Sequence, residues 1–172
     1  ELLTILQYRH QILLAARTSK KPGQFKDKNN RAGETHFVDH ALVRGTIIKG
    51  FDYYQALQEP FAKAAYIMFM ISEIHPFLDG NGRIARVMMN AELVKANQIR
   101  IIIPTVYRDD YLGALRRLTR NDDPAVYIRM LQRAQEFSAT LVANDMEALE
   151  NHLTQSNAFK EHDEAKLKII TF

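Results

Sequence analysis

The sequence predicts an all-α fold with one small β element, and three observations support this prediction. Apolar residues recur at helical spacing along most of the chain, 47% of the 172 residues are apolar, and there are only 7 Gly and 5 Pro. This composition suits a globular domain with a buried core and excludes collagen-like, low-complexity and disordered chains. We therefore expect residues 1–172 to form a single domain with helices at both ends.

The N-terminal part is predicted to be a helix, then a polar loop, then a small hairpin. Residues 18–34 are polar and rich in turn formers, so they predict a loop. The β-formers that follow Gly33 predict a hairpin or flap at about residues 33–38. The first helix, which we expect to end near Arg17, is indicated by residues at helical spacing: Ile5, Leu6, His10, Leu13 and Leu14.

The middle of the chain is predicted to contain a helix, a loop and a second helix, after a shorter helix at 41–49. An apolar stripe over residues 61–74 predicts a helix that is buried on most sides. This helix must end at His75-Pro76, because proline cannot continue the hydrogen-bond ladder and disfavours the α conformation in the residue before it. A further apolar pattern predicts the second helix over about residues 81–97.

Three more helices are predicted in the second half, each opened by an acidic residue that can cap a helix. They are expected from Asp109 or Asp110 to Leu118, from Asp123-Pro124 to about residue 142, and from Asp145 to Leu153. Residues 165–172 show no clear pattern.

Charge and apolar content limit the partners of the chain. Its 23 Lys and Arg oppose 20 Asp and Glu, which gives a formal net charge of only +3, so we expect no nucleic-acid partner. No apolar run is long enough to span a bilayer and no signal peptide is visible, so we expect no membrane partner and a cytoplasmic location. The absence of Cys excludes thiolate nucleophiles and Cys-ligated zinc. Since the chain begins with Glu1 inside a helical pattern, we expect a fragment of a longer protein.

The segment 75–86, His-Pro-Phe-Leu-Asp-Gly-Asn-Gly-Arg-Ile-Ala-Arg, concentrates residues suited to phosphate chemistry. Gly80 and Gly82 let the backbone reach positive φ and approach a ligand, directly before a helix whose first amides are unpaired. Such a helix start is an anion site that prefers phosphate. Arg83 and Arg86 share a helix face, which indicates a ligand with more than one phosphate.

Asp79 and His75 add a possible metal ligand and a possible base to this site. One carboxylate can hold a Mg²⁺ ion that also takes phosphate oxygens, and a histidine has a suitable pKa for a base. Each feature alone has a structural alternative: a capping or buried histidine, a plain turn or calcium-type loop, and a solvated arginine face. Their occurrence within one turn favours the functional interpretation.

The same segment matches H-P-F-x-[DE]-G-N-G-R-x-x-R at all nine specified positions, and it resembles the signature of Fic-domain proteins. The resemblance implies a Fic-type helical bundle with a small β-hairpin flap, over about residues 24–137. It also implies an enzyme, a Mg²⁺- and ATP-dependent protein adenylyltransferase that moves AMP from ATP to a Ser, Thr or Tyr hydroxyl of a target protein and releases pyrophosphate.

Roles for single residues follow from this resemblance. His75 would be the base, Asp79 the Mg²⁺ ligand and Arg86 the contact to the γ-phosphate. The other nucleotide-binding residues would be Gly80, Asn81, Gly82, Arg83, Asn90 and Tyr111, and the flap that grips the target would present Thr35, His36 and Phe37. Packing explains Phe37 equally well. Gly82 favours AMP transfer, because the related Doc-type kinases have Lys at that position.

Regulation and the exact reaction stay open. Many Fic proteins carry an inhibitory helix with [ST]-x-x-x-E-[GN], but here the only Glu followed by Gly or Asn is Glu150, and Met146 stands where Ser or Thr is required. Three explanations stay open: the inhibitory helix lies in upstream sequence, an antitoxin partner supplies it, or the protein is not regulated in this way. The alternatives to AMP transfer are a nucleotide-binding regulatory module, AMP removal, or transfer of another phosphate group.

Overall fold

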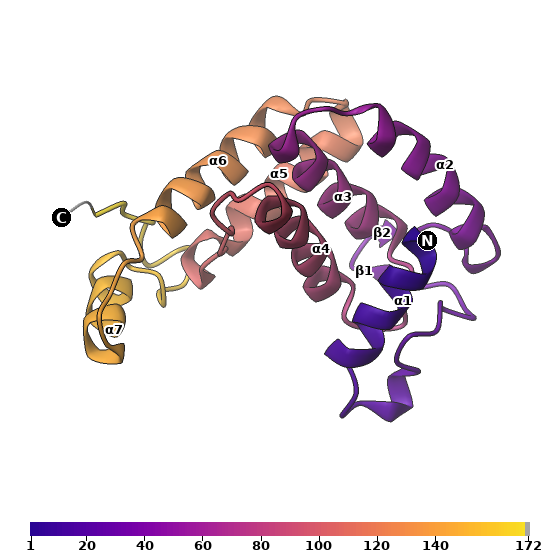
Figure 1. The fold of residues 1–172 in the computed structure, drawn as a ribbon, viewed down its shortest axis with the longest axis horizontal. Helices are drawn as coiled ribbons and strands as arrows, with labels where there is room; N and C mark the ends of the chain where they lie inside the picture. Colours follow the sequence, from indigo (N-terminus) through magenta and orange to yellow (C-terminus); the bar gives the residue numbers. More distant parts are fainter. Residues whose placement is uncertain (171–172) are drawn as a thin grey trace. The chain divides into compact units, whose positions relative to one another are not determined.

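A computed structural model describes residues 1–170 and leaves residues 171 and 172 outside the description. Within residues 1–170 there are seven α-helices and one two-stranded sheet, which confirms the predicted all-α fold with a small hairpin (Figure 1). The chain forms two compact units, Glu1–Ala96 and a second one that begins at Asn97. The predicted site segment lies wholly in the first unit.

The first unit contains the four helices α1 (Leu2–Leu13), α2 (Val43–Ala56), α3 (Pro60–Ile74) and α4 (Asn81–Lys95). α3 packs against α4 and α2, and α1 packs against α4 and α2. α3 is buried over most of its surface, as its apolar stripe predicts, and proline at its first position is favourable because that amide needs no partner. Fully buried side chains between these helices include Leu6, Leu14, Ile47, Met68, Ile71, Ile84, Met89 and Leu93.

Two helix boundaries in this unit differ from the sequence-based expectation. α1 ends at Leu13, before the expected Arg17. α2 begins at Val43, after a 3₁₀ turn at His40–Leu42, and continues to Ala56 instead of ending near Lys49. The 3₁₀ turn is stabilised by Asp39, whose carboxylate accepts a hydrogen bond from the amide of Ala41.

The hairpin consists of β1 (Arg31–Ala32) and β2 (Thr35–His36), which pair antiparallel with Arg31 opposite His36. A two-residue turn joins the strands, and Gly33 in this turn has a φ of 56°, which suits glycine. The hairpin therefore begins two residues before the predicted flap.

The second unit contains a 3₁₀ turn (Thr105–Tyr107), α5 (Arg108–Asn121), α6 (Ala125–Ala139) and α7 (Met146–Gln155). α5 does not begin with an aspartate cap, because the 3₁₀ turn runs directly into it and Asp109 and Asp110 lie in its first turn. The predicted cap of α7 is confirmed, since Asp145 accepts from the amide of Ala148 at 2.7 Å. At the start of α6, the Asp123 carboxylate accepts from the amide of Ala125 at 3.0 Å.

No helix within residues 1–170 combines the length and the apolar character needed to cross a bilayer.

Candidate active site

The loop between α3 and α4 places His75 at the end of a helix in a left-handed conformation. Its amide still donates to the carbonyl of Ile71 at 3.0 Å, but its φ is 50° and its ψ is 58°. The following Pro76 was expected to make the residue before it extended. Instead the chain reverses at His75 itself, and such a backbone costs a residue other than glycine about 1–2 kcal/mol.

The imidazole of His75 is held in the tautomer that a base needs. Its Nδ1 lies 2.8 Å from the carbonyl oxygen of Ser72. Because a carbonyl only accepts, Nδ1 is assigned the proton, and Nε2 keeps its lone pair. Burial lowers the pKa of His75, so the neutral ring is favoured near neutral pH. Phe37 stacks on this ring with centroids 3.6 Å apart and planes 9° apart.

Gly80 is the N-cap residue of α4, and its backbone conformation favours glycine. Its φ is 76°, and a Cβ atom there would lie 3.1 Å from Leu14 Cδ1 and 3.4 Å from His10 Nε2. No side chain caps the first amides of α4, so these N–H groups are available to an anion and the helix dipole favours it.

The other two residues of the predicted phosphate cradle differ in what they offer. Asn81 uses its side chain inside the loop: Oδ1 accepts from the amide of Phe77 at 2.9 Å, and Nδ2 donates to its carbonyl at 2.8 Å. The side chain of Asn81 therefore holds the loop together, and its backbone amide lies at the start of α4. Gly82 is helical, without positive φ, and a Cβ atom there would lie 3.5 Å from Arg86 Nη1. Gly82 thus keeps space open beside Arg86.

The charged groups of the motif surround one polar cavity of about 350 Å³. Asp79 accepts from Arg17 Nη1 at 2.6 Å and lies 3.7 Å from Arg83 Nη2. Arg86 is half-buried and forms no ion pair within residues 1–170. The lining residues are Asn30, Arg31, His75, Leu78, Asp79, Gly80, Asn81, Gly82, Arg83 and Arg86. An imidazole, a carboxylate, backbone amides at a helix start and guanidinium groups therefore lie around one cavity, and their roles stay predictions.

Asp79 fits a Mg²⁺ ion that a ligand shares. Within residues 1–170 no group of three or more His, Asp or Glu could hold a metal by itself. Mg²⁺ typically keeps several waters and takes one or two carboxylates together with substrate phosphates. A single carboxylate in an anion-binding cavity matches that donor set, and Arg17 would have to release the oxygen that the ion takes.

The remaining predicted residues lie in three places. Asn90 is half-buried on α4, one turn after Arg86, and Tyr111 is buried on α5 in the second unit. In the hairpin Thr35 is half-buried and His36 exposed. Their roles stay predictions. Phe37 makes a packing contact, as one of its two interpretations expects, and this contact is with the ring of His75.

Three residues that touch the motif loop or its cavity carried no recognisable signal in the sequence. Arg17 lies at the expected end of the first helix, and Arg31 lies in the polar stretch that predicts only a loop. His10 follows the apolar spacing of α1, and this position indicates burial without indicating its partners. It is fully buried, and the amide of Gly23 donates to its Nδ1 at 3.0 Å.

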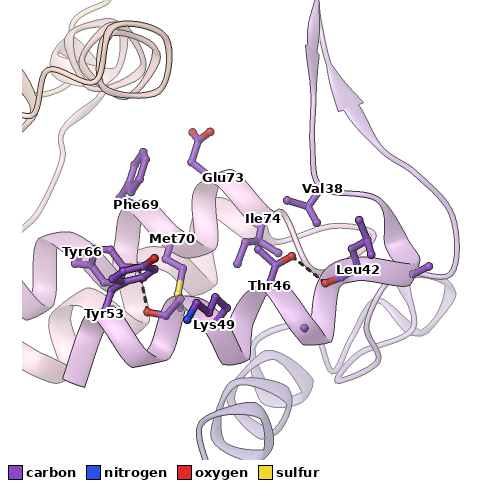
Figure 2. Close-up of a pocket in the computed structure, with 13 residues that line it drawn as sticks. Val38, Leu42, Thr46, Lys49, Tyr53, Tyr66, Phe69, Met70, Glu73 and Ile74 are labelled. Atoms are coloured by element: carbon purple, nitrogen blue, oxygen red, sulfur yellow. Dashed lines mark hydrogen bonds between the residues drawn. The ribbon is translucent and has the colours of Figure 1, made fainter. Parts of the chain in front are cut away.

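A second cavity, of about 580 Å³, lies between α2 and α3 and is mostly lined by apolar groups (Figure 2). Val38, Thr46 and Ile74 lie at one end and Tyr53 and Tyr66 at the other. The two helices approach closely at Gly50, where a Cβ atom would meet Met70 Sδ at 2.5 Å. This cavity contains no arginine and shares no lining residue with the polar one.

Comparison with known proteins identifies related sequences. A family model described as Fic/DOC family matches residues 3–93, which include most of α1 and the whole motif. A protein adenylyltransferase Fic from Drosophila persimilis is 36% identical over 77 residues, which is 45% of this chain and 15% of that protein. A Fido domain-containing protein from Dictyostelium discoideum is 27% identical over 103 residues, 57% of this chain and 72% of that protein.

Solved structures show the same fold. Fic-1 from C. elegans superposes with a TM-score of 0.66 at 18% identity, over 90% of this chain and 44% of that one. A Fic family protein from Desulfovibrio desulfuricans superposes with a TM-score of 0.66 at 21% identity, over 94% of this chain and 58% of that one. This chain belongs to the Fic/DOC family. It spans about 15% of the length of the fly adenylyltransferases that it matches.

Proposed function

We propose that this chain transfers AMP from ATP to a hydroxyl group of a target protein. The observation that carries the proposal is the contact of His75 Nδ1 with the carbonyl oxygen of Ser72, which assigns the proton to Nδ1 and leaves Nε2 able to act as a base; His75 lines the same cavity as the start of α4. Membership of the Fic/DOC family and similarity to proteins named adenylyltransferases support the same reaction.

In this reaction the target hydroxyl gives its proton to Nε2 of His75. The hydroxyl oxygen then forms a bond to the α-phosphorus of ATP, and the bond from that phosphorus to the bridging oxygen breaks. Pyrophosphate leaves with the bonding electrons, and His75 later returns its proton to water. A positioned base of this kind contributes roughly 10²–10⁴-fold to a rate.

The other residues of the cavity would bind and orient the phosphates. The free amides at the start of α4 suit the α- and β-phosphates, and the half-buried Arg86 suits the γ-phosphate. Arg83 would support the loop, since it already lies near Asp79. Asp79 would hold Mg²⁺, which supplies charge neutralisation of the phosphates when bound.

The hairpin would present the target. Phe37 directly follows β2 and stacks on His75, so a strand added along Thr35 and His36 would run beside the base. The partners in this proposal are ATP and a protein with an acceptor hydroxyl, and control would come from an inhibitory helix or an antitoxin partner outside this chain.

Two radiolabelled nucleotides test the reaction directly. The protein is incubated with Mg²⁺, candidate targets and ATP labelled at either the α- or the γ-phosphate. A target protein labelled only by α-labelled ATP supports AMP transfer, and a target labelled only by γ-labelled ATP would indicate a kinase. If no target is labelled by either nucleotide, a nucleotide-binding module or an enzyme that removes AMP remains. His75→Ala is the matched control for every sample.

A further inference from the structure

Lys26 is a deeply buried lysine that the reaction above does not use. It is 3% exposed and lies in the loop between α1 and the hairpin. Lysine is almost never buried to this extent unless its ammonium group has partners. Nζ donates to Asn30 Oδ1 at 2.7 Å and to the carbonyl oxygen of Ile74 at 3.3 Å. The ammonium group therefore lies at the C-terminus of α3, directly before His75.

Lys26 and Asn30 together bind four consecutive carbonyl groups around the base. These are the carbonyl groups of Ile74, His75, Pro76 and Phe77. Nζ of Lys26 donates to the carbonyl oxygen of Ile74, as above, and the backbone amide of Lys26 donates to that of Pro76 at 2.8 Å. Nδ2 of Asn30 donates to the carbonyl oxygen of His75 at 3.4 Å and to that of Phe77 at 3.0 Å.

The backbone of His75 is the part of this segment that needs such support. Its left-handed conformation is unfavourable for histidine, and strained residues persist only where their surroundings fix them. We propose that Lys26 and Asn30 are positioning residues that hold the backbone of His75 in this conformation and place a positive charge beside its imidazole. This inference rests on the proposed function, in which His75 is the base.

The charge of Lys26 has a direction that can be tested. A cation near His75 disfavours protonation of the ring, in addition to the burial that lowers the pKa of His75. Burial also lowers the pKa of Lys26 itself, and the Asp39 carboxylate opposes that effect. The charged groups that line the cavity of His75 are Arg31, Asp79, Arg83 and Arg86.

The test replaces Lys26 by methionine, which keeps the length of the side chain and removes its charge and donors. We expect Lys26→Met to lower kcat for AMP transfer by about 10²-fold through misplacement of the base. KM for ATP should change by less than about threefold in this variant, because the hydrogen bonds of Lys26 go to Asn30, Ile74 and Pro76 and not to the start of α4. The pKa of His75, followed by NMR of labelled histidine, should rise, and the acid limb of the kcat profile should move to higher pH. Lys26→Arg should recover most of the rate.

Lys63→Met is the matched control, because Lys63 is a half-buried lysine on α3 that lies over the ring of Tyr54, away from the cavity of His75. It should leave kcat and the pKa of His75 unchanged. A folded Lys26→Met variant with wild-type kcat and an unchanged His75 pKa overturns the proposal.

Two further measurements keep the result decisive. If Lys26→Met does not fold, Asn30→Ala replaces it: kcat should fall at unchanged KM for ATP, and a wild-type kcat overturns the proposal. If the wild-type chain transfers no AMP, the proposed reaction fails, but the NMR comparison still tests the role of Lys26 beside His75. An unchanged His75 pKa in Lys26→Met or Lys26→Gln would then overturn the positioning proposal, and a raised pKa would support it.

Discussion

The ring of His10 lies flat on the ring of Phe77, with centroids 3.6 Å apart and planes 3° apart. The Nε2 atom of His10 lies 3.0 Å from the carbonyl oxygen of Asp79, and Nδ1 accepts from Gly23. Because Nδ1 accepts, Nε2 must be the donor, so the ring is neutral and both nitrogens are used. α1 thus fixes the motif loop through one histidine that lies more than sixty residues before it.

Acid should destabilise the protein through His10 and His75. Burial lowers the pKa of both residues below 6.5, the value of an exposed histidine, so the unfolded chain binds more protons than the folded one below that pH. The contribution of these two histidines to the free energy of unfolding should be constant above about pH 7 and should fall as the pH decreases through 6.5. Urea titrations at several pH values measure this dependence of the free energy of unfolding on pH.

His10→Phe separates the contribution of His10. The variant keeps a ring to stack on Phe77 but leaves the Asp79 carbonyl and the Gly23 amide without their partner, which should cost about 1–3 kcal/mol at neutral pH. The fall in the free energy of unfolding below pH 6.5 should be smaller in this variant than in the wild type. His162→Phe, at an exposed position, serves as control. If the fall in His10→Phe equals that of the wild type, groups other than His10 take up the protons that destabilise the protein.

Gly80→Ala and Gly82→Ala should have opposite effects on stability. At Gly80 the new methyl group meets Leu14 and the left-handed backbone, so we expect a loss of at least about 1–2 kcal/mol. At Gly82 the backbone is helical and the nearest atom lies 3.5 Å away, so alanine should raise stability by about 0.5–1 kcal/mol.

The same Gly82→Ala variant should bind ATP more weakly, because its methyl group fills space beside Arg86. Thermal unfolding and calorimetric ATP titration of one preparation measure both effects. Weaker ATP binding in a variant that is not destabilised would indicate that Gly82 is needed for the ligand and not for folding. An ATP affinity equal to that of the wild type would show that Gly82 does not face the nucleotide.

His75→Ala should abolish AMP transfer and leave ATP affinity close to that of the wild type. The loss should be roughly 10²–10⁴-fold, the usual contribution of a base, because other groups hold the phosphates. Transfer rate and ATP titration are measured on the same sample, with His162→Ala as control. A transfer rate near wild type would remove His75 from the reaction.

Arg86→Ala should weaken ATP binding by about 1.5–3 kcal/mol, the usual range for hydrogen bonds to a charged group. Arg86 lines the polar cavity and has no ion-pair partner within residues 1–170, so its loss leaves no carboxylate unpaired. Arg44→Ala is the control, because Arg44 lies on α2 over the ring of Phe25. Isothermal titration with unchanged affinity in Arg86→Ala would place the γ-phosphate elsewhere.

Local pattern predicted the parts of the site that depend on local chemistry. The helix break at His75-Pro76, the start of α4 at Asn81 and the need for glycine at position 80 all follow from neighbours in sequence. The contacts of Lys26 and His10 with the motif join residues 48 and 69 positions apart, and nothing in a helical period or a turn signal specifies such pairs. Pattern also failed at α5, where a 3₁₀ turn replaced the expected aspartate cap.

The side chains that line the polar cavity carry more positive than negative charge. Three guanidinium groups, those of Arg31, Arg83 and Arg86, oppose the single carboxylate of Asp79 among its lining residues, which leaves a formal excess of two positive charges in about 350 Å³. Small anions of the medium are drawn to such a space, so inorganic phosphate or sulfate should compete with the nucleotide for it. Since these side chains are partly exposed to solvent, their attraction is screened by salt, and the first encounter with a polyphosphate depends on ionic strength.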